Sequence, residues 1–196
     1  MKLHSIKFKA MGSPCELQLY MDDKHASVIG QQACSLINQV EARYSRYQTS
    51  SITSRINAAA GAAAIELDDE TARLIDYANV MHQQSDGLFD ITSGILRNAW
   101  NFKSRQVPSP QQLEQLLPLI GWQHVEWHAP FFRLPRAGME IDFGGYVKEY
   151  TADLVANFCV QAGIHHGLIN LGGDIHVIGP HLDGTPWRDI SRGRPR

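Results

Sequence analysis

The stretch EIDFGGYVKEYTAD, residues 140–153, brings together residue types that bind phosphate-bearing ligands. Asp142 ends an alternating apolar pattern that predicts a strand, and Gly144 and Gly145 come shortly after it. Glycines let a backbone approach a ligand closely, and the start of a helix favours anions through its amides and its dipole. Lys148, near the first turn of the helix that we expect next, would add a positive charge for such an anion.

These residues predict roles around a cofactor that carries phosphate. Asp142 would accept hydrogen bonds from a base, a flavin ring or a ribose, and the backbone carbonyl around Gly145 would bind a hard cation such as Mg²⁺. The same pattern also fits a tight strand-to-helix turn in which Asp142 is a cap and Lys148 and Glu149 are solvated. The stretch taken alone leaves both interpretations open.

Composition narrows the class of protein. The 196 residues are 43% hydrophobic, which suits one compact domain with a core, or slightly more than one. The net charge of −2 provides no global field toward nucleic acid or membrane. The three scattered cysteines argue against a disulfide framework or a structural zinc site. The sequence contains no long apolar run, and the start MKLHSIKFKAMGSPC has no signal-peptide core, so we expect a cytoplasmic protein without a membrane span.

The elements that must position these residues follow from hydrophobic periodicity and capping signals. Strands come in hairpins and long helices lie between them, so the fold class that we expect is α+β with a mostly antiparallel sheet packed against long helices. The helices expected are 24 to about 47, a short turn ended by Gly61, about 70–84 capped by Asp68 or Asp69, one from Asp90 or Thr92 to about Trp100, one capped by Ser109, and 146–162. The strands expected surround a Gly-Ser-Pro turn in SIKFKAMGSPCELQLYM, pair HVEWHA with FFRL, cover MEIDF, and surround Gly172-Gly173 in HGLINLGGDIHVIG.

The C-terminal tail differs from the rest of the chain. A strand begins at Trp187 in the sequence pattern and then loses its alternation, and four of the last nine residues are arginine. A frayed end accounts for this better than a surface for phosphate or RNA.

Four separated segments resemble the ApbE family, the FAD:protein FMN transferases. They occur in the family's order and cover nearly the whole chain, so a chance match is improbable. The segments are MGSPCELQLY, YSRYQTSSITSRIN, SDGLFDITSGILRNAWNF, and IDFGGYVKEYTADLV together with LINLGGDIHVIG.

The resemblance implies an enzyme that binds FAD, cleaves its pyrophosphate with Mg²⁺ and transfers FMN to a Ser or Thr hydroxyl of an acceptor flavoprotein. It implies cofactor-binding roles for Met11, Tyr47, Leu88, Phe89, Asp90, Asp142 and Lys148, and a metal-ligating carbonyl at Gly145. It identifies no catalytic residue.

Several alternatives stay open beside that resemblance. Met11 also fits a core residue, Tyr47 a core or rim aromatic, and Asp90 a helix cap. The family's distal Asp-Pro-x-Thr-Gly segment and metal-binding acids have no counterpart here, so we expect residues 1–196 to form a single ApbE-like FAD-binding domain that lacks the family's C-terminal portion. A non-catalytic FAD-binding fragment or scaffold is the alternative function. A nucleotide cyclase, suggested by Gly-Gly-Asp at 172–174, lacks the residues that should follow.

Overall fold

The computed structural model describes residues 1–100 and 107–188, and it has the expected α+β fold class. The chain divides into two compact units. The first contains Met1–Ala42 and the described residues from Tyr146 onward, and the second contains Arg43–Gly145. The expected single FAD-binding domain over 1–196 stays a prediction.

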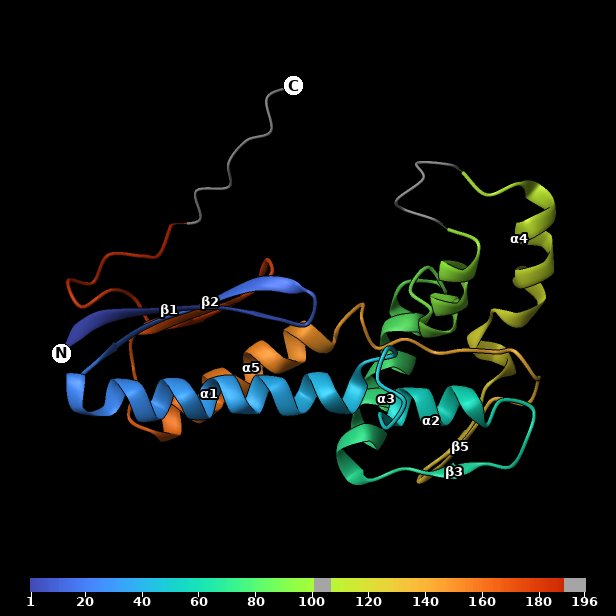
Figure 1. The fold of residues 1–196 in the computed structure, drawn as a ribbon, viewed down its shortest axis with the longest axis horizontal. Coiled ribbons are helices and arrows are strands. Elements are labelled where there is room, and N and C mark those ends of the chain that lie inside the picture. The colour runs from blue at the N-terminus through green and yellow to red at the C-terminus, as the bar shows by residue number, and fades with distance from the viewer. Residues whose placement is uncertain (101–106, 189–196) are drawn as a thin grey trace. The chain divides into compact units, whose positions relative to one another are not determined.

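A four-stranded antiparallel sheet forms one layer of the first unit (Figure 1). Its strands are β1 (Lys2–Ala10), β2 (Ser13–Met21), β6 (Gly167–Leu171) and β7 (Asp174–Ile178), in the order β1-β2-β6-β7. Alternate residues of β2, among them Leu17 and Leu19, are buried, as period-two alternation predicts. The turn between β1 and β2 lies at Met11 and Gly12, whose φ angles are 51° and 72°. The expected Gly-Ser-Pro turn is therefore wrong, because Ser13 and Pro14 already pair with β1.

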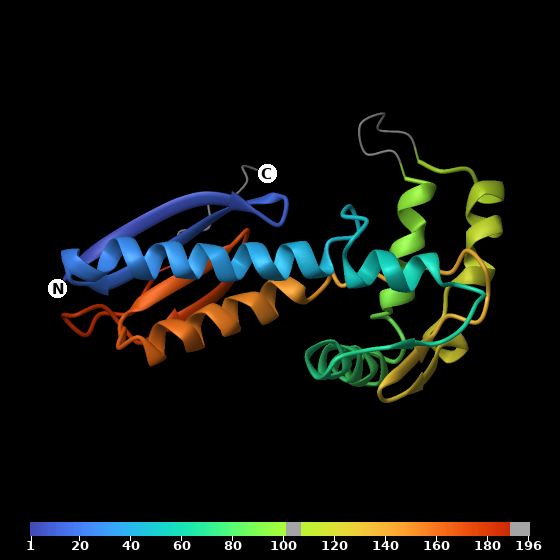
Figure 2. The same cartoon turned by 60° about the horizontal axis from the view of Figure 1, so that its bottom comes forward.

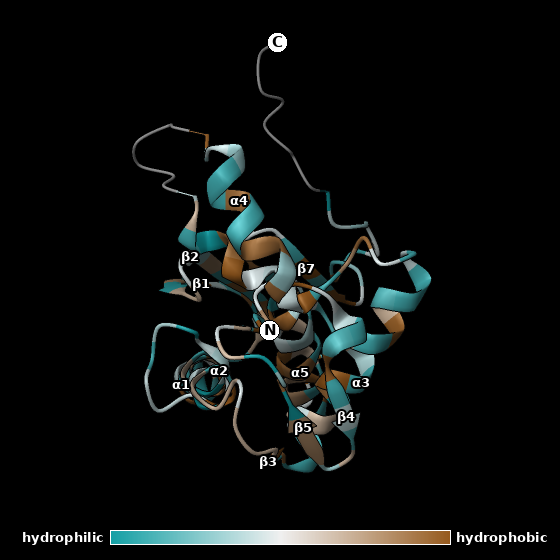
Figure 3. Cartoon of the chain, turned by 90° about the vertical axis from the view of Figure 1, so that its right-hand side faces the viewer, coloured by the Kyte–Doolittle hydropathy of each residue, from teal (hydrophilic) through white to brown (hydrophobic). Residues whose placement is uncertain are grey.

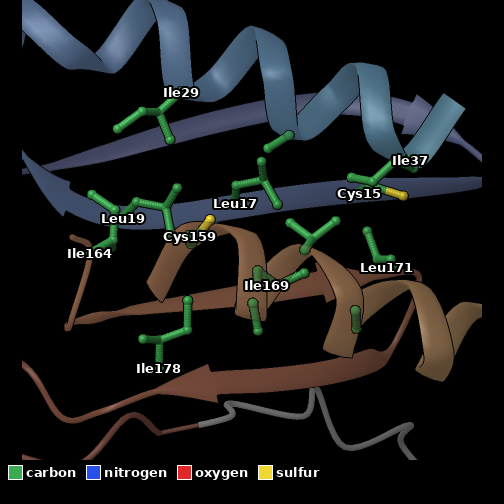
Figure 4. Close-up of a cluster of buried hydrophobic side chains, with 14 of the residues drawn as sticks. Cys15, Leu17, Leu19, Ile29, Ile37, Cys159, Ile164, Ile169, Leu171 and Ile178 are labelled. Atoms are coloured by element: carbon green, nitrogen blue, oxygen red, sulfur yellow. The ribbon is translucent and has the colours of Figure 1, made fainter. Parts of the chain in front are cut away.

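Two helices cover one face of this sheet. Helices α1 (Asp23–Tyr44) and α5 (Val147–Gln161) lie side by side along it, as both views show (Figures 1 and 2). Side chains from the two helices and the strands meet in one apolar core, shown in Figure 4. Its labelled members are Cys15, Leu17, Leu19, Ile29, Ile37, Cys159, Ile164, Ile169, Leu171 and Ile178.

The second unit consists mainly of short helices around a three-stranded antiparallel sheet with the order β3-β5-β4. Its strands are β3 (Ile65–Glu66), β4 (Glu126–His128) and β5 (Phe131–Arg133). Its helices are α2 (Ile52–Ala58), α3 (Asp69–Gln84), α4 (Pro110–Leu116) and the 3₁₀ helices η1 (Ile91–Asn98), η2 (Leu117–Leu119) and η3 (Trp122–His124). Figure 3 shows α4 as largely hydrophilic, in agreement with its lack of buried residues.

Helix starts in this unit follow the capping signals of the sequence. Ser51, Asp68 and Asp90 each accept a backbone hydrogen bond from the first turn of the helix that follows. Ser109 forms a capping box with Gln112, and Pro110 takes the first helical position. These caps confirm the expected N-termini.

Two further expectations about local structure are wrong. Helix α1 ends at Tyr44 rather than at residue 47, and the Tyr44 carbonyl accepts a hydrogen bond of 2.8 Å from Thr53 Oγ1. Residues 139–143, the expected MEIDF strand, are extended but pair with no strand of the described chain. The strand expected to begin at Trp187 lies mostly outside the described residues, which end at residue 188.

Candidate functional site

The extended segment 139–143 is held by a side chain instead of a neighbouring strand. The amide of Asn57 donates to the Ile141 carbonyl (3.1 Å) and its oxygen accepts from the Ile141 N–H (2.7 Å). Met139, Ile141 and Phe143 are buried, so the segment alternates inward and outward like a strand. This alternation produced the strand prediction, and one asparagine satisfies the backbone groups that a strand partner would have paired.

Asp142, on the outward side of this segment, has a fixed carboxylate. Its Oδ2 accepts a hydrogen bond from the Arg46 guanidinium, and its Oδ1 accepts one from the Gly144 N–H at 2.9 Å. The Asp142 N–H donates to the Ile91 carbonyl at 2.9 Å. A Cβ at Gly94 would lie 2.6 Å from the Asp142 Cβ, so the close approach of η1 requires glycine there. The carboxylate is 23% exposed and remains accessible to a ligand.

Arg46, the partner of Asp142, also contacts Tyr47. The Tyr47 hydroxyl receives a hydrogen bond of 2.9 Å from Arg46 Nη2, and the guanidinium carbon lies 5.0 Å from the ring centroid. Tyr47 is 80% exposed, which excludes the core position among the alternatives and leaves a rim aromatic or a ring that offers a face to a flat ligand.

The loop after α3 presents the expected residues Leu88 and Phe89. The side chain of Leu88 is 91% exposed. Phe89 is anchored through its backbone, because its N–H donates to Ser85 Oγ (2.9 Å) and its carbonyl lies 2.9 Å from His82 Nδ1. A Cβ at Gly145 would lie 3.2 Å from Phe89 Cε2, so the structure brings these two predicted residues together.

The Asp90 carboxylate forms hydrogen bonds within the second unit. Its Oδ1 accepts from the Thr92 N–H (2.8 Å) and the Thr92 hydroxyl (2.7 Å), and its Oδ2 accepts from the Trp122 N–H (2.8 Å). Capping therefore accounts for this carboxylate, which is the simpler of the two interpretations that the sequence left open.

Met11 and Lys148 belong to the first unit. Met11 occupies the β1–β2 turn and packs, partly buried, against the apolar core. Lys148 lies in the first turn of α5, and its Nζ forms an ion pair of 2.6 Å with Asp174 Oδ2 from the start of β7. Glu149 is exposed.

Gly172 and Gly173 form the turn before Asp174. Gly172 has φ of 70°, and a Cβ there would lie 2.5 Å from the Ser13 Cβ, so both the backbone conformation and the space require glycine.

The described residues include groups suited to an anion but no complete Mg²⁺ site. Helix α5 begins with no side-chain cap at its N-cap residue, Tyr146, so the first-turn amides are not satisfied from that position. In the first unit, the start of α5 with Lys148 in its first turn is the kind of position that favours an anionic group. The described residues contain no group of three His, Cys, Asp or Glu side chains that could hold a metal ion. One carbonyl, that of Gly145, does not meet the near-octahedral demand of Mg²⁺.

Sequence reasoning missed Arg46, the Asn57 clamp and the Asp174 partner of Lys148. Arg46 directly precedes the predicted Tyr47, and all three residues lie within segments that carry the family resemblance, but that resemblance assigned them no role. Their partners lie 96, 84 and 26 positions away in the sequence, and only the folded chain brings them together.

Comparison with known proteins gives consistent matches. The FAD:protein FMN transferase of Klebsiella pneumoniae (strain 342) is 30% identical over 96% of this chain and 60% of that protein. That of Chlamydia pneumoniae is 29% identical over 86% of this chain and 54% of that protein. The chain thus spans between half and two thirds of the length of these curated relatives.

Solved structures show the same fold. The flavin transferase ApbE from Vibrio cholerae superposes with a TM-score of 0.88 at 21% identity, covering 96% of this chain and 63% of that one. The ApbE protein from Thermotoga maritima gives a TM-score of 0.85 at 24% identity, with 95% and 62% covered. The ApbE family model matches residues 11–191, and the chain belongs to the ApbE family.

Proposed function

We propose that this chain binds FAD and takes part in the Mg²⁺-dependent transfer of FMN from FAD to a Ser or Thr hydroxyl of an acceptor flavoprotein. The observation that carries the proposal is the fixed carboxylate of Asp142 beside an exposed aromatic ring, in a chain whose relatives are named FAD:protein FMN transferases.

Each predicted residue has a part in that proposal. Asp142 accepts hydrogen bonds from the adenine or flavin edge, and Tyr47 stacks on a ring. Leu88, Phe89 and the Asp90 backbone line the cofactor. Met11 packs against it, and Lys148 holds a polar part of FAD.

The reaction is a displacement at phosphorus. The acceptor hydroxyl oxygen forms a bond to the FMN phosphorus, the pyrophosphate P–O bond breaks, AMP leaves and the hydroxyl proton is released. Such transfers depend on positioning and on neutralising phosphate charge. Gly145 is proposed to offer its carbonyl to the metal; the remaining ligands are not among the described residues, and we assign no step to the metal.

The alternative is FAD binding without transfer. It requires only the binding groups, Asp142 and Tyr47, that carry the proposal. The structure has no helix in its described part that is long and apolar enough to cross a membrane.

Titration of the 196-residue chain with FAD, with and without Mg²⁺, tests binding, and in-gel flavin fluorescence after incubation with an acceptor flavoprotein tests transfer. Binding with labelling supports the transferase, and binding without labelling supports the alternative. If mixing leaves both the fluorescence of FAD and the melting temperature of the protein unchanged, the transferase and the binding-only alternative are both wrong.

Substitution of Asp142 tests the site itself. Asp142→Ala is expected to weaken FAD binding by about 1–3 kcal/mol, the scale of a lost hydrogen bond to a charged group. Glu140→Ala is the matched control, because Glu140 lies two residues earlier and pairs with Arg97 at 2.5 Å. Equal affinities of Asp142→Ala and the unchanged chain would remove Asp142 from the site.

A further inference from the structure

The side chain of Arg46 links two connecting segments of the second unit. It lies in the connection between Tyr44, the last residue of α1, and Ser51, the N-cap of α2. Its side chain is only 24% exposed, and its guanidinium reaches Asp142, 96 positions later in the chain.

One guanidinium serves two predicted FAD contacts at once. Nη1 donates to Asp142 Oδ2, while Nη2 donates to the Tyr47 hydroxyl at 2.9 Å. The planar fork of arginine can serve two acceptors in fixed directions, which an ammonium group on a flexible stem does not reproduce. The orientation of the acid and that of the ring are therefore coupled.

The pairing also determines what Asp142 offers a ligand. Oδ2 is used by Arg46 and Oδ1 by the Gly144 N–H, and each carboxylate oxygen keeps further acceptor capacity. Arg46 also balances the charge of Asp142. Without it, a carboxylate with only 23% of its surface exposed would lose its charged partner.

We infer that Arg46 is a positioning residue of the FAD site: its guanidinium sets the orientation of both the Asp142 carboxylate and the Tyr47 ring for the dinucleotide. This inference rests on the proposed function, because it presupposes that the chain binds FAD. It adds a residue to which neither the family resemblance nor the predicted site assigned a role.

The second unit contains a close control. Arg97 also pairs with an acid of the same segment, Glu140, through a contact of 2.5 Å. Arg97 also donates to the neighbouring Asn98 side chain, and neither contact involves a predicted FAD residue. Arg97→Ala therefore removes one arginine and one ion pair from this segment while leaving Asp142 and Tyr47 in place.

The experiment measures FAD affinity of the 196-residue chain by isothermal titration calorimetry, with melting temperatures recorded in parallel. Arg46→Ala is expected to weaken binding about tenfold or more, the scale of charged hydrogen bonds. Arg46→Lys is expected to restore only part of the affinity, because one ammonium replaces a two-pronged donor. Arg97→Ala is expected to bind within about twofold of the unchanged chain.

The double variant Arg46→Ala/Asp142→Ala separates positioning from a direct contact. If Arg46 acts through Asp142, the double variant binds about as weakly as the weaker single variant, since coupled residues give non-additive losses. Fully additive losses would overturn the inference, as would affinity of Arg46→Ala within about twofold of the unchanged chain.

Tyr47→Phe covers the case in which Arg46→Ala does not fold. Tyr47 is exposed, so removal of its hydroxyl leaves the core intact. A weakening of about two- to fivefold is expected, because the ring loses its contact with Arg46 but keeps its face. Unchanged affinity of both Tyr47→Phe and Arg46→Lys would refute the positioning role. Absence of FAD binding by the unchanged chain would instead refute the proposed function, and the inference with it.

Discussion

The Nζ of Lys148 lies 2.6 Å from Oδ2 of Asp174, and this ion pair joins the first turn of α5 to the start of β7. Both side chains are a little over one quarter exposed. A lysine proposed to contact FAD thus already has a carboxylate partner, and an anionic ligand must share or displace it.

Substitution of this lysine should expose the carboxylate. Lys148→Met is expected to weaken FAD binding about tenfold or more, because one charged donor is lost and Asp174 is left to repel phosphate. The double variant Lys148→Met/Asp174→Asn should recover part of that loss, since it removes the repelling charge. Calorimetric titration measures both affinities. Lys9→Met, at an exposed position of β1, controls for net charge, and an equal loss in that variant would contradict a local role for Lys148.

The Asn57 clamp predicts a stability effect within the second unit. Asn57→Ala removes both hydrogen bonds to the Ile141 backbone and should lower the free energy of unfolding by about 1–3 kcal/mol. Asn57→Asp keeps an acceptor for the Ile141 N–H but places an oxygen against the Ile141 carbonyl, so it should not restore stability. Urea unfolding measures both variants. Asn98→Ala, an exposed asparagine of the same unit, is expected to change stability little; a loss as large as that of Asn57→Ala would argue against the clamp.

Asp68 predicts a pH dependence. Burial raises the pKa of its carboxyl. The Thr71 N–H and the Arg43 guanidinium lower that pKa by more than burial raises it, so the folded pKa lies below the ordinary value. A lowered folded pKa contributes stability above the unfolded pKa, and that stability is lost as the pH falls through the folded value. Asp68→Asn keeps a cap oxygen and loses only the charge.

The stability difference between the unchanged chain and Asp68→Asn should therefore shrink as the pH falls from 7 to about 3, in urea unfolding at each pH. Asp68→Ala should cost about 1 kcal/mol at neutral pH, because it removes the cap of α3. Asp69→Asn is the matched control for a charge in the same helical turn. A difference that grows on acidification would contradict the assignment.

The cysteines predict an order of chemical reactivity. Burial raises the pKa of Cys159 to about 12, and it also raises those of Cys15 and Cys34. Since the thiolate is the reactive form, Cys159 should remain unmodified by a thiol reagent at pH 8 until the chain unfolds, while the half-buried Cys34 should react first. Mass spectrometry of peptides after timed labelling gives the order. Rapid modification of Cys159 in the folded chain would show that its core position is open.

Patterns that are local in sequence were predicted correctly. The β1–β2 and β6–β7 hairpins, the cap at Asp68 and the capping box at Ser109 each depend on a few neighbouring residues. The helical periodicity before Tyr44 was also sufficient to locate α1, although not its end, which coincides with a tertiary hydrogen bond from Thr53.

Features that depend on distant residues were not predicted from the sequence. The alternation in 139–143 is genuine, but its hydrogen bonds go to Asn57 rather than to a strand, and periodicity alone does not distinguish the two. The pairing of Arg46 with Asp142 also required the folded chain. The family resemblance implied roles for Asp142 and Tyr47 but none for Arg46, which contacts both.

The backbone at Gly94 lies against Asp142, so the residue at position 94 helps to set the position of the acid. Because a single methyl group there would occupy the space of the Asp142 Cβ, even alanine would push the acid-bearing segment outward. A screen for variants with altered nucleotide preference or affinity is therefore expected to yield substitutions at position 94, although glycine itself has no side chain that could contact a ligand. If Asp142 binds the dinucleotide as proposed, ligand selectivity depends on the backbone spacing at Gly94 as well as on the side chains that face the ligand.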